Sequence, residues 1–159
     1  MDIVVIEEIF HLIDDKDNLE VPGGWDEYDY ENAYLRALEL KQRIERFVGD
    51  SCYMNSKYSV EKASYLVDIE LPVSVLVSEN EDAKIRISNF GSMLTIIGNK
   101  LHDSLSISED FREGVLSMID EMEFKLIPNE CLWIKYPKDK RFSRRKFKNW
   151  GHRYFEFIK

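Results

Sequence analysis

The side chains of this chain that could do chemistry are mostly carboxylates, and they gather in an early segment. Asp15-Lys16-Asp17 opens like a calcium-binding loop, in which alternating side-chain oxygens coordinate the ion. The fifth position of such a loop is Leu19 and the sixth is Glu20, where an oxygen ligand and then a glycine are required, so the match fails. The cluster leaves two alternatives: weak binding of a divalent cation, as in a small carboxylate-based enzyme, or a solvated acidic loop.

Other catalytic motifs are incomplete. His11, His102 and His152 are isolated in the sequence, without a second histidine or a cysteine at metal-ligand spacing. Gly91-Ser92 and Gly98-Asn99-Lys100 satisfy neither the pattern of a nucleophile elbow nor that of a phosphate-binding loop. Because no motif points to a reaction, we expect a protein that is not an enzyme and that uses no metal or other cofactor.

The acidic segment 14–31 has a second interpretation, as a surface that binds a protein. Its carboxylates surround Trp25, Tyr28 and Tyr30. Aromatic side chains inside a charged rim are typical of protein interfaces, where the rings supply affinity and the charges raise the association rate. The residues that we expect at this interface are Asp14, Asp15, Asp17, Trp25, Asp26, Glu27 and Tyr28, and a second candidate patch on a predicted hairpin turn consists of Glu79, Glu81 and Asp82. The alternative is a solvated loop with Trp25 packed on the core.

The end of the chain carries the opposite charge. Lysines and arginines crowd residues 138–148, and Phe142, Phe147 and Trp150 could stack on bases. This makes a nucleic-acid-binding regulator a second alternative. The chain as a whole has a net charge of −8, however, and would repel a polyanion, so we expect the stretch to be a solvated basic rim of the fold.

The composition is typical of one folded unit. A length of 159 residues is that of a single domain, so we expect one domain covering residues 1–159, and the 33% of charged residues predicts a densely charged surface. No apolar run is long enough to span a membrane, and Asp2 stands where a signal peptide would be basic, so we expect a cytoplasmic protein. Cys52 and Cys131, each in a segment predicted to be a strand, are expected to be buried free thiols.

The clearest predicted element is a helix over residues 30–48. Its apolar residues recur at helical spacing, basic residues crowd its last turns, and Gly49 follows. A shorter helix is predicted over 3–13, and a third over 109–123, which Ser106 and Glu109 could begin with a capping box. The stripe expected to face the core in the main helix consists of Tyr30, Ala33, Tyr34, Ala37, Leu38, Ile44, Phe47 and Val48.

Strands are predicted between and after these helices. Residues 51–98 alternate apolar and polar side chains, and turn residues divide them into runs, which predicts an antiparallel meander. Pro72 within one run suggests a kink or an edge strand. Residues 124–127 and 154–158 are predicted to be extended as well. The order of elements predicts an α+β fold in which helices pack on one face of a mostly antiparallel sheet.

Short motifs in the C-terminal third carry a family resemblance. They are Pro128-Asn129-Glu130-Cys131-Leu132 with Tyr136, and then Trp150 ahead of Arg153-Tyr154-Phe155-Glu156-Phe157, to which Ser88-Asn89-Phe90-Gly91 adds a little. In these residues the chain resembles small bacterial immunity proteins, which neutralise the toxins of contact-dependent growth inhibition and other polymorphic toxin systems. We expect the motif residues to serve the core, so the resemblance assigns no toxin contact to them.

The resemblance implies stoichiometric inhibition. An immunity protein of this kind binds a toxin domain made in the same cell and blocks its active site or substrate groove. Many such toxins are nucleases, whose clefts are basic because they hold phosphates, so an acidic protein can fill the cleft as a phosphate mimic. The net charge of −8 agrees with such a basic partner.

Overall fold

The computed structural model of this chain describes residues 30–55, 66–78, 82–88, 93–98, 107–135 and 148–151. The helix predicted over 3–13 and the strand predicted over 154–158 lie outside these residues. The described elements, in chain order, are α2 (Tyr30–Val48), β1 (Tyr53–Met54), β2 (Val67–Glu70), the 3-10 helix η2 (Val73–Val75), β3 (Lys84–Ile87), β4 (Met93–Ile97), α3 (Glu109–Glu121), β5 (Lys125–Leu126) and the 3-10 helix η3 (Asn129–Trp133).

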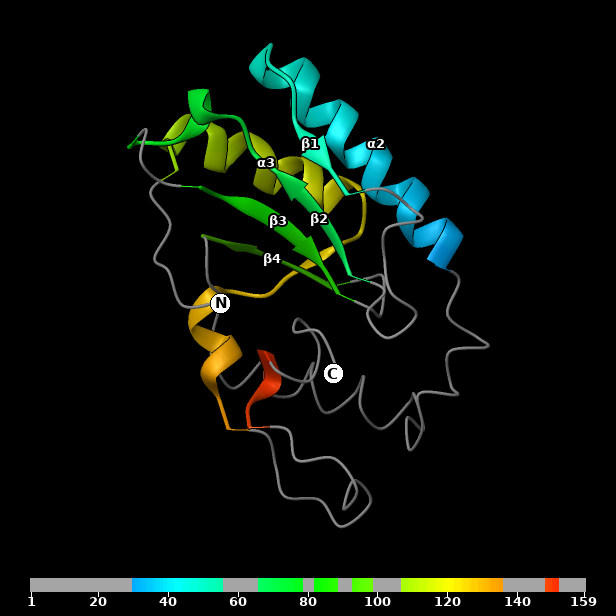
Figure 1. Cartoon of the computed structure of the whole chain (residues 1–159), viewed down its shortest axis with the longest axis vertical. Coiled ribbons are helices and arrows are strands. Elements are labelled where there is room, and N and C mark those ends of the chain that lie inside the picture. The colour runs from blue at the N-terminus through cyan, green and yellow to red at the C-terminus, as the bar shows by residue number, and fades with distance from the viewer. Residues whose placement is uncertain are drawn as a thin grey trace.

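The described strands form one sheet in the order β1-β2-β3-β4-β5 (Figure 1). Each neighbouring pair from β1 to β4 is antiparallel, whereas β5 runs parallel to β4. A parallel neighbour needs a long crossover connection, which α3 supplies between β4 and β5. Both helices lie on the same side of the sheet (Figure 1). The predicted α+β fold, with helices on one face of a mostly antiparallel sheet, is confirmed.

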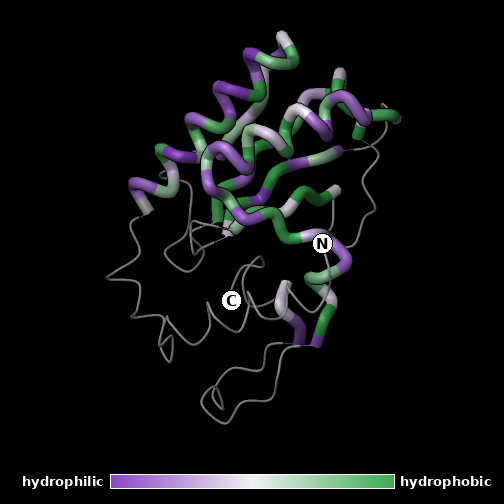
Figure 2. Tube along the Cα trace, turned by 180° about the vertical axis from the view of Figure 1, so that it is seen from behind, coloured by the Kyte–Doolittle hydropathy of each residue, from purple (hydrophilic) through white to green (hydrophobic). Residues whose placement is uncertain are grey.

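Helix α2 forms where the hydrophobic period predicted it. Ala33, Ala37, Leu40 and Ile44 recur at helical spacing and are buried. The helix ends at Val48, and the next residue, Gly49, adopts a φ of +70° that favours glycine and donates its N–H to the carbonyl of Glu45 at 2.9 Å. The alternation of apolar and polar residues along α2 and α3 is visible in Figure 2.

Two details of the helix predictions are wrong. Phe47, which was placed in the buried stripe of α2, is 50% exposed. Ser108, and not Ser106, is the N-cap of α3, and it makes no side-chain capping bond with a described residue. The N–H of Ser108 instead donates to the carbonyl of Val75 at 2.9 Å, so a contact with η2 fixes the start of the helix.

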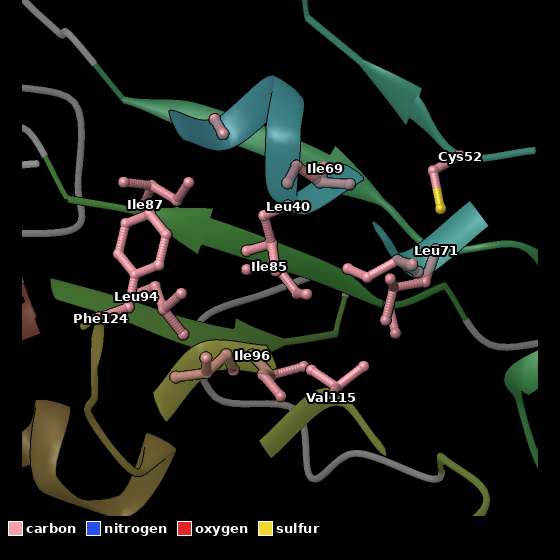
Figure 3. Close-up of a cluster of buried hydrophobic side chains, with 14 of the residues drawn as sticks. Leu40, Cys52, Ile69, Leu71, Ile85, Ile87, Leu94, Ile96, Val115 and Phe124 are labelled. Atoms are coloured by element: carbon pink, nitrogen blue, oxygen red, sulfur yellow. The ribbon is translucent and has the colours of Figure 1, made fainter. Parts of the chain in front are cut away.

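The main core lies between the helices and the sheet (Figure 3). Leu40 of α2 and Val115 of α3 contribute to it from above the sheet, and Ile69, Ile85 and Leu94 from neighbouring strands. Full burial of an aliphatic side chain of this size stabilises the folded state by about 1.5–3 kcal/mol. This cluster therefore holds both helices on one face.

The opposite face of the sheet is covered by a second, smaller layer. Successive strand residues point to opposite faces, so Met93 and Ile97 of β4 face away from the helices, and both are buried. The 3-10 helix η3 packs against β4 with Leu132 buried. Trp150 is 1% exposed. Its backbone N–H donates to the carbonyl of Ile134 at 3.1 Å, which ties the segment 148–151 to the end of η3.

Two other predictions are corrected by this arrangement. Cys131 lies in η3 and not in a strand. Pro72 follows β2 and is the N-cap of η2, while β2 itself pairs with β1 on one side and β3 on the other. The proline therefore marks where the strand stops, because its missing N–H falls just outside the ladder.

Candidate functional site

Most of the predicted interface lies outside the described residues. This applies to Asp14, Asp15, Asp17, Trp25, Asp26, Glu27 and Tyr28, and to Glu79 and Glu81 of the second patch. Asp82 is described and exposed, just before β3. The interpretation of these residues as an interface stays a prediction. The surfaces that the structure describes lie on α2, α3 and the sheet.

The outer surface of α3 is acidic. Its carboxylates are exposed, and the only cation in the helix is Arg112. Leu116, which is 40% exposed, lies among them, because Glu109, Glu113, Leu116 and Asp120 follow one another at helical spacing along one line. We call this surface the acidic face of α3; its members are Glu109, Asp110, Glu113, Asp120, Glu121, Glu123 and Leu116. The sequence contained the signal for it in this spacing, although only the earlier acidic segment was singled out.

Ion pairs join α2 to this acidic face. Arg43 contacts Glu39 on its own helix, Nη2 to Oε1 at 2.8 Å, and Glu121 on α3, Nη1 to Oε2 at 3.1 Å. Nearby, the guanidinium of Arg36 donates to the carbonyl of Met122 at 2.6 Å and stacks over the ring of Phe124. Exposed pairs of this kind add little stability, so their effect is mainly to set how the two helices lie against each other.

An open furrow of about 650 Å³ runs between α2 and α3. The half-exposed ring of Phe47 lies against the backbone of α3 at Gly114, where an added Cβ would overlap Cζ of that ring. Gly114 is therefore the residue that lets the ring approach. The lining residues are Glu39, Arg43, Arg46, Phe47, Gly114, Ser117, Met118 and Glu121.

The sheet face opposite the helices carries a buried polar row. Asp68 on β2 lies opposite Arg86 on β3, which lies opposite Thr95 on β4. The carboxylate of Asp68 accepts two hydrogen bonds from Arg86, from Nε and from Nη2, each at 2.7 Å, and Lys84 Nζ lies 3.2 Å away. Asn55 Oδ1 accepts the N–H of Asp68 at 2.9 Å.

These contacts decide the chemistry of Asp68. Burial raises its pKa, but the hydrogen bonds and charge of Arg86, with those of Lys84, outweigh burial and hold the pKa below its ordinary value. The carboxylate is thus ionised at neutral pH and forms ion pairs with Arg86 and Lys84. We interpret it as a group that fixes the register of β2 against β3 and not as a general base.

Thr95 has a different role in this row, because its hydroxyl is buried without a partner among the described residues. A buried hydroxyl that forms no hydrogen bond costs about 1–3 kcal/mol. Thr95→Val keeps the shape and removes that cost, so we expect it to raise the free energy of unfolding by about 1 kcal/mol. Denaturant unfolding monitored by circular dichroism checks this result, and a clear loss of stability would mean that the hydroxyl has a partner.

Both cysteines are buried free thiols, as predicted. Burial, with the nearby charge of Glu45, raises the pKa of Cys52 to about 11. Burial also raises the pKa of Cys131, and the charge of Glu130 adds to the effect. The thiolate is the nucleophilic form, so neither residue is suited to covalent catalysis at neutral pH.

Glu45 connects α2 to the edge of the sheet. Its Oε1 accepts hydrogen bonds from Lys41 Nζ at 2.7 Å and from the N–H of Cys52 at 2.9 Å. The bond from Lys41, and then the bond from Cys52, lower the pKa of Glu45. The carboxylate is therefore ionised at neutral pH. It accepts the backbone N–H of Cys52, which lies outside the helix and strand hydrogen bonds.

Two observations bear on the alternative functions, a cation-dependent enzyme and a nucleic-acid-binding regulator. Within the part of the chain that the structure describes, no group of three or more histidine, cysteine or carboxylate side chains could hold a metal ion. Trp150, which was considered as a stacking surface for bases, is buried and so cannot serve in that way, while residues 138–147 lie outside the described residues. None of the described helices is long and apolar enough to cross a bilayer.

The comparisons with known proteins add no relative to this picture. Family models, curated protein sequences and solved structures were compared with the chain, and none of them matches it.

Proposed function

We propose that this protein is an immunity protein, which binds a cognate toxin domain of the nuclease type in the cytoplasm and blocks its active site stoichiometrically. The acidic face of α3, with exposed Leu116 among its carboxylates, is the observation that carries the proposal. A partly apolar centre inside a charged rim suits a protein partner, since the apolar side chain loses its water on binding while the rim selects the partner.

The charge of the surface indicates the chemistry of the partner. A nuclease cleft is basic because it binds phosphates, and an acidic helix can occupy it in their place. The attraction also steers the encounter and raises the association rate by ~10- to 1,000-fold at low ionic strength. The net charge of −8 supports the same partner over the whole chain.

The resemblance to immunity proteins also supports the proposal. Two of its motif residues, Leu132 and Trp150, are buried, which agrees with the expectation that they serve the core. The partner surface must then be formed by other residues, and the acidic face of α3 meets that need.

Co-expression with the product of the adjacent upstream gene tests the proposal. We expect the two proteins to elute together on size exclusion and this chain to relieve growth arrest caused by that product. Separate elution together with an absence of toxicity would contradict the immunity function.

A charge reversal on α3 tests the surface itself. Glu113→Lys changes the centre of the acidic face, and we expect it to slow association with the co-eluting partner about tenfold at low salt. Glu130→Lys makes the same change in charge at an exposed residue of η3, and it should leave the rate nearly unchanged. Stopped-flow or surface plasmon resonance measures both rates; equal slowing by the two variants would remove α3 from the interface.

A further inference from the structure

Phe47 and Gly114 bring an exposed aromatic ring against the backbone of α3. Half of the Phe47 residue is exposed, although the ring rests on α3. Glycine inside a helix destabilises it relative to alanine, and Gly114 lies in the middle of α3. The two residues suit each other because the missing side chain makes room for the ring, yet together they leave an aromatic surface in water. Exposed apolar surface with a polar rim marks interaction sites.

The furrow is broad and open to solvent, with room for more than one side chain of another protein. Its apolar floor consists of Phe47, Gly114 and Met118, and its volume is about 650 Å³. At one end Arg43 is neutralised by Glu39 and Glu121, so that end needs no charge from a partner. The remaining wall residues are Ser117, which is neutral, and Arg46, which is a cation.

The charges around the furrow indicate which occupant it fits. The acidic face of α3 runs along one side, so lysines and arginines of a partner would be attracted there, and the phosphates of a nucleic acid would be repelled. Arg46 lines the furrow near the C-terminal end of α2, and its Nε donates to the carbonyl of Gln42. A cation at that place favours the C-terminal end of a docked helix, where the carbonyl groups carry partial negative charge.

We propose that the furrow between α2 and α3 seats the bulky apolar side chains of a basic helical segment of the partner protein, with the ring of Phe47 as their main contact. This inference rests on the proposed function and specifies its interface. Recognition of this kind lays the apolar stripe of an amphipathic helix into a groove, and the helix direction is set by Arg46 at one end of the furrow. Phe47 is then the residue whose truncation weakens binding most, since buried aromatic contacts dominate interface affinity.

Synthetic peptides test the furrow without the toxin. The probes are a lysine-rich helical peptide with a leucine stripe, the same peptide with serine in place of leucine, and a glutamate-rich peptide with the same leucine stripe. We expect the lysine-leucine peptide alone to cause saturable shifts of the Gly114 and Phe47 amide signals in nitrogen-proton correlation spectra. Shifts confined to other regions, or equal binding of the serine peptide, would overturn the proposal.

Two variants and a matched control sharpen this test. Phe47→Ser should weaken binding of the lysine-leucine peptide about tenfold or more. Gly114→Ala should weaken it as well, because the added Cβ displaces the ring while the helix keeps its fold, as circular dichroism can verify. Leu35→Ser removes a comparably exposed apolar side chain of α2, and should leave the affinity unchanged. Equal weakening by Leu35→Ser and Phe47→Ser would contradict a role for the furrow.

The outcomes separate this inference from the proposed function. Peptide binding at the furrow with no upstream partner would retain the furrow and reject the toxin. Co-elution with a partner whose affinity is insensitive to Phe47→Ser would retain the immunity function and reject the furrow.

Discussion

Asp68→Ala is expected to lower the free energy of unfolding by about 3–5 kcal/mol, because it removes one partner of a largely buried ion pair with Arg86. Arg86 is 8% exposed and gives Asp68 two hydrogen bonds of 2.7 Å. Chemical denaturation of the variant and of the unchanged protein measures the difference.

A second variant separates the charge from the shape. Asp68→Leu combined with Arg86→Met removes both charges together, and replacing a whole buried ion pair by apolar residues is often neutral or stabilising. We therefore expect the double variant to be more stable than Asp68→Ala. Asp82→Ala, on an exposed carboxylate before β3, should change stability by about 0.5 kcal/mol or less. A loss as large in Asp82→Ala as in Asp68→Ala would refute the argument.

The effect of Asp68 should also depend on pH. Its pKa in the folded protein lies below its ordinary value of 3.8, so the folded state favours the ionised form. The stabilisation is then fully present above pH 3.8 and is lost as the pH falls through the lower, folded pKa. The difference between Asp68→Ala and the unchanged protein should accordingly be full at neutral pH and shrink in strong acid.

Trp150→Ala is the second large effect that we expect, with a loss of about 3–5 kcal/mol. Trp150 is 1% exposed, and its removal leaves a cavity in the layer that covers the second face of the sheet. The backbone bond from Trp150 to Ile134 does not depend on the side chain and does not fill that cavity. Thermal unfolding followed by circular dichroism checks the loss.

Trp133→Ala is the matched control for this variant. Trp133 lies in η3 but is 39% exposed, so its truncation should cost clearly less, about 1 kcal/mol. A Trp150→Ala protein of unchanged stability would contradict the buried position of this residue and would reopen its role as a stacking surface for bases.

The helices show how far a periodic pattern reaches. Ala33, Ala37 and Ile44 were predicted to face the core and do so. Apolar residues at helical spacing lie on one side of the helix, and they are removed from water when that side packs on the core. Phe47 belongs to the same stripe, but it lies in the last turn of α2, where α3 covers only part of its ring. Periodicity gives the side of the helix on which a residue lies, whereas its burial depends on how far the packed neighbour extends.

The sheet shows the same limit. The antiparallel meander from β1 to β4 follows from alternation and turn residues, which are local signals. The parallel pairing of β5 with β4 depends on a crossover through α3, and β5 itself is only Lys125–Leu126. A strand so short carries too little pattern to specify its partner. For the candidate interface, the spacing of carboxylates on α3 was readable from the sequence, but the contact of Phe47 with Gly114 joins residues far apart in the chain and needed the fold.

The bond from the N–H of Cys52 to Glu45 has a consequence for how copies of this protein behave toward one another. β1 lies at one edge of the described sheet, and an edge strand offers unpaired backbone groups on which a strand of another chain can add. Tyr53 pairs with β2, so the N–H of its neighbour Cys52 points outward, to the place where an added strand would bind. Glu45 already occupies that donor and sets a charge beside it. Helix α2 thus blocks part of the free edge of β1 and disfavours aggregation by strand addition.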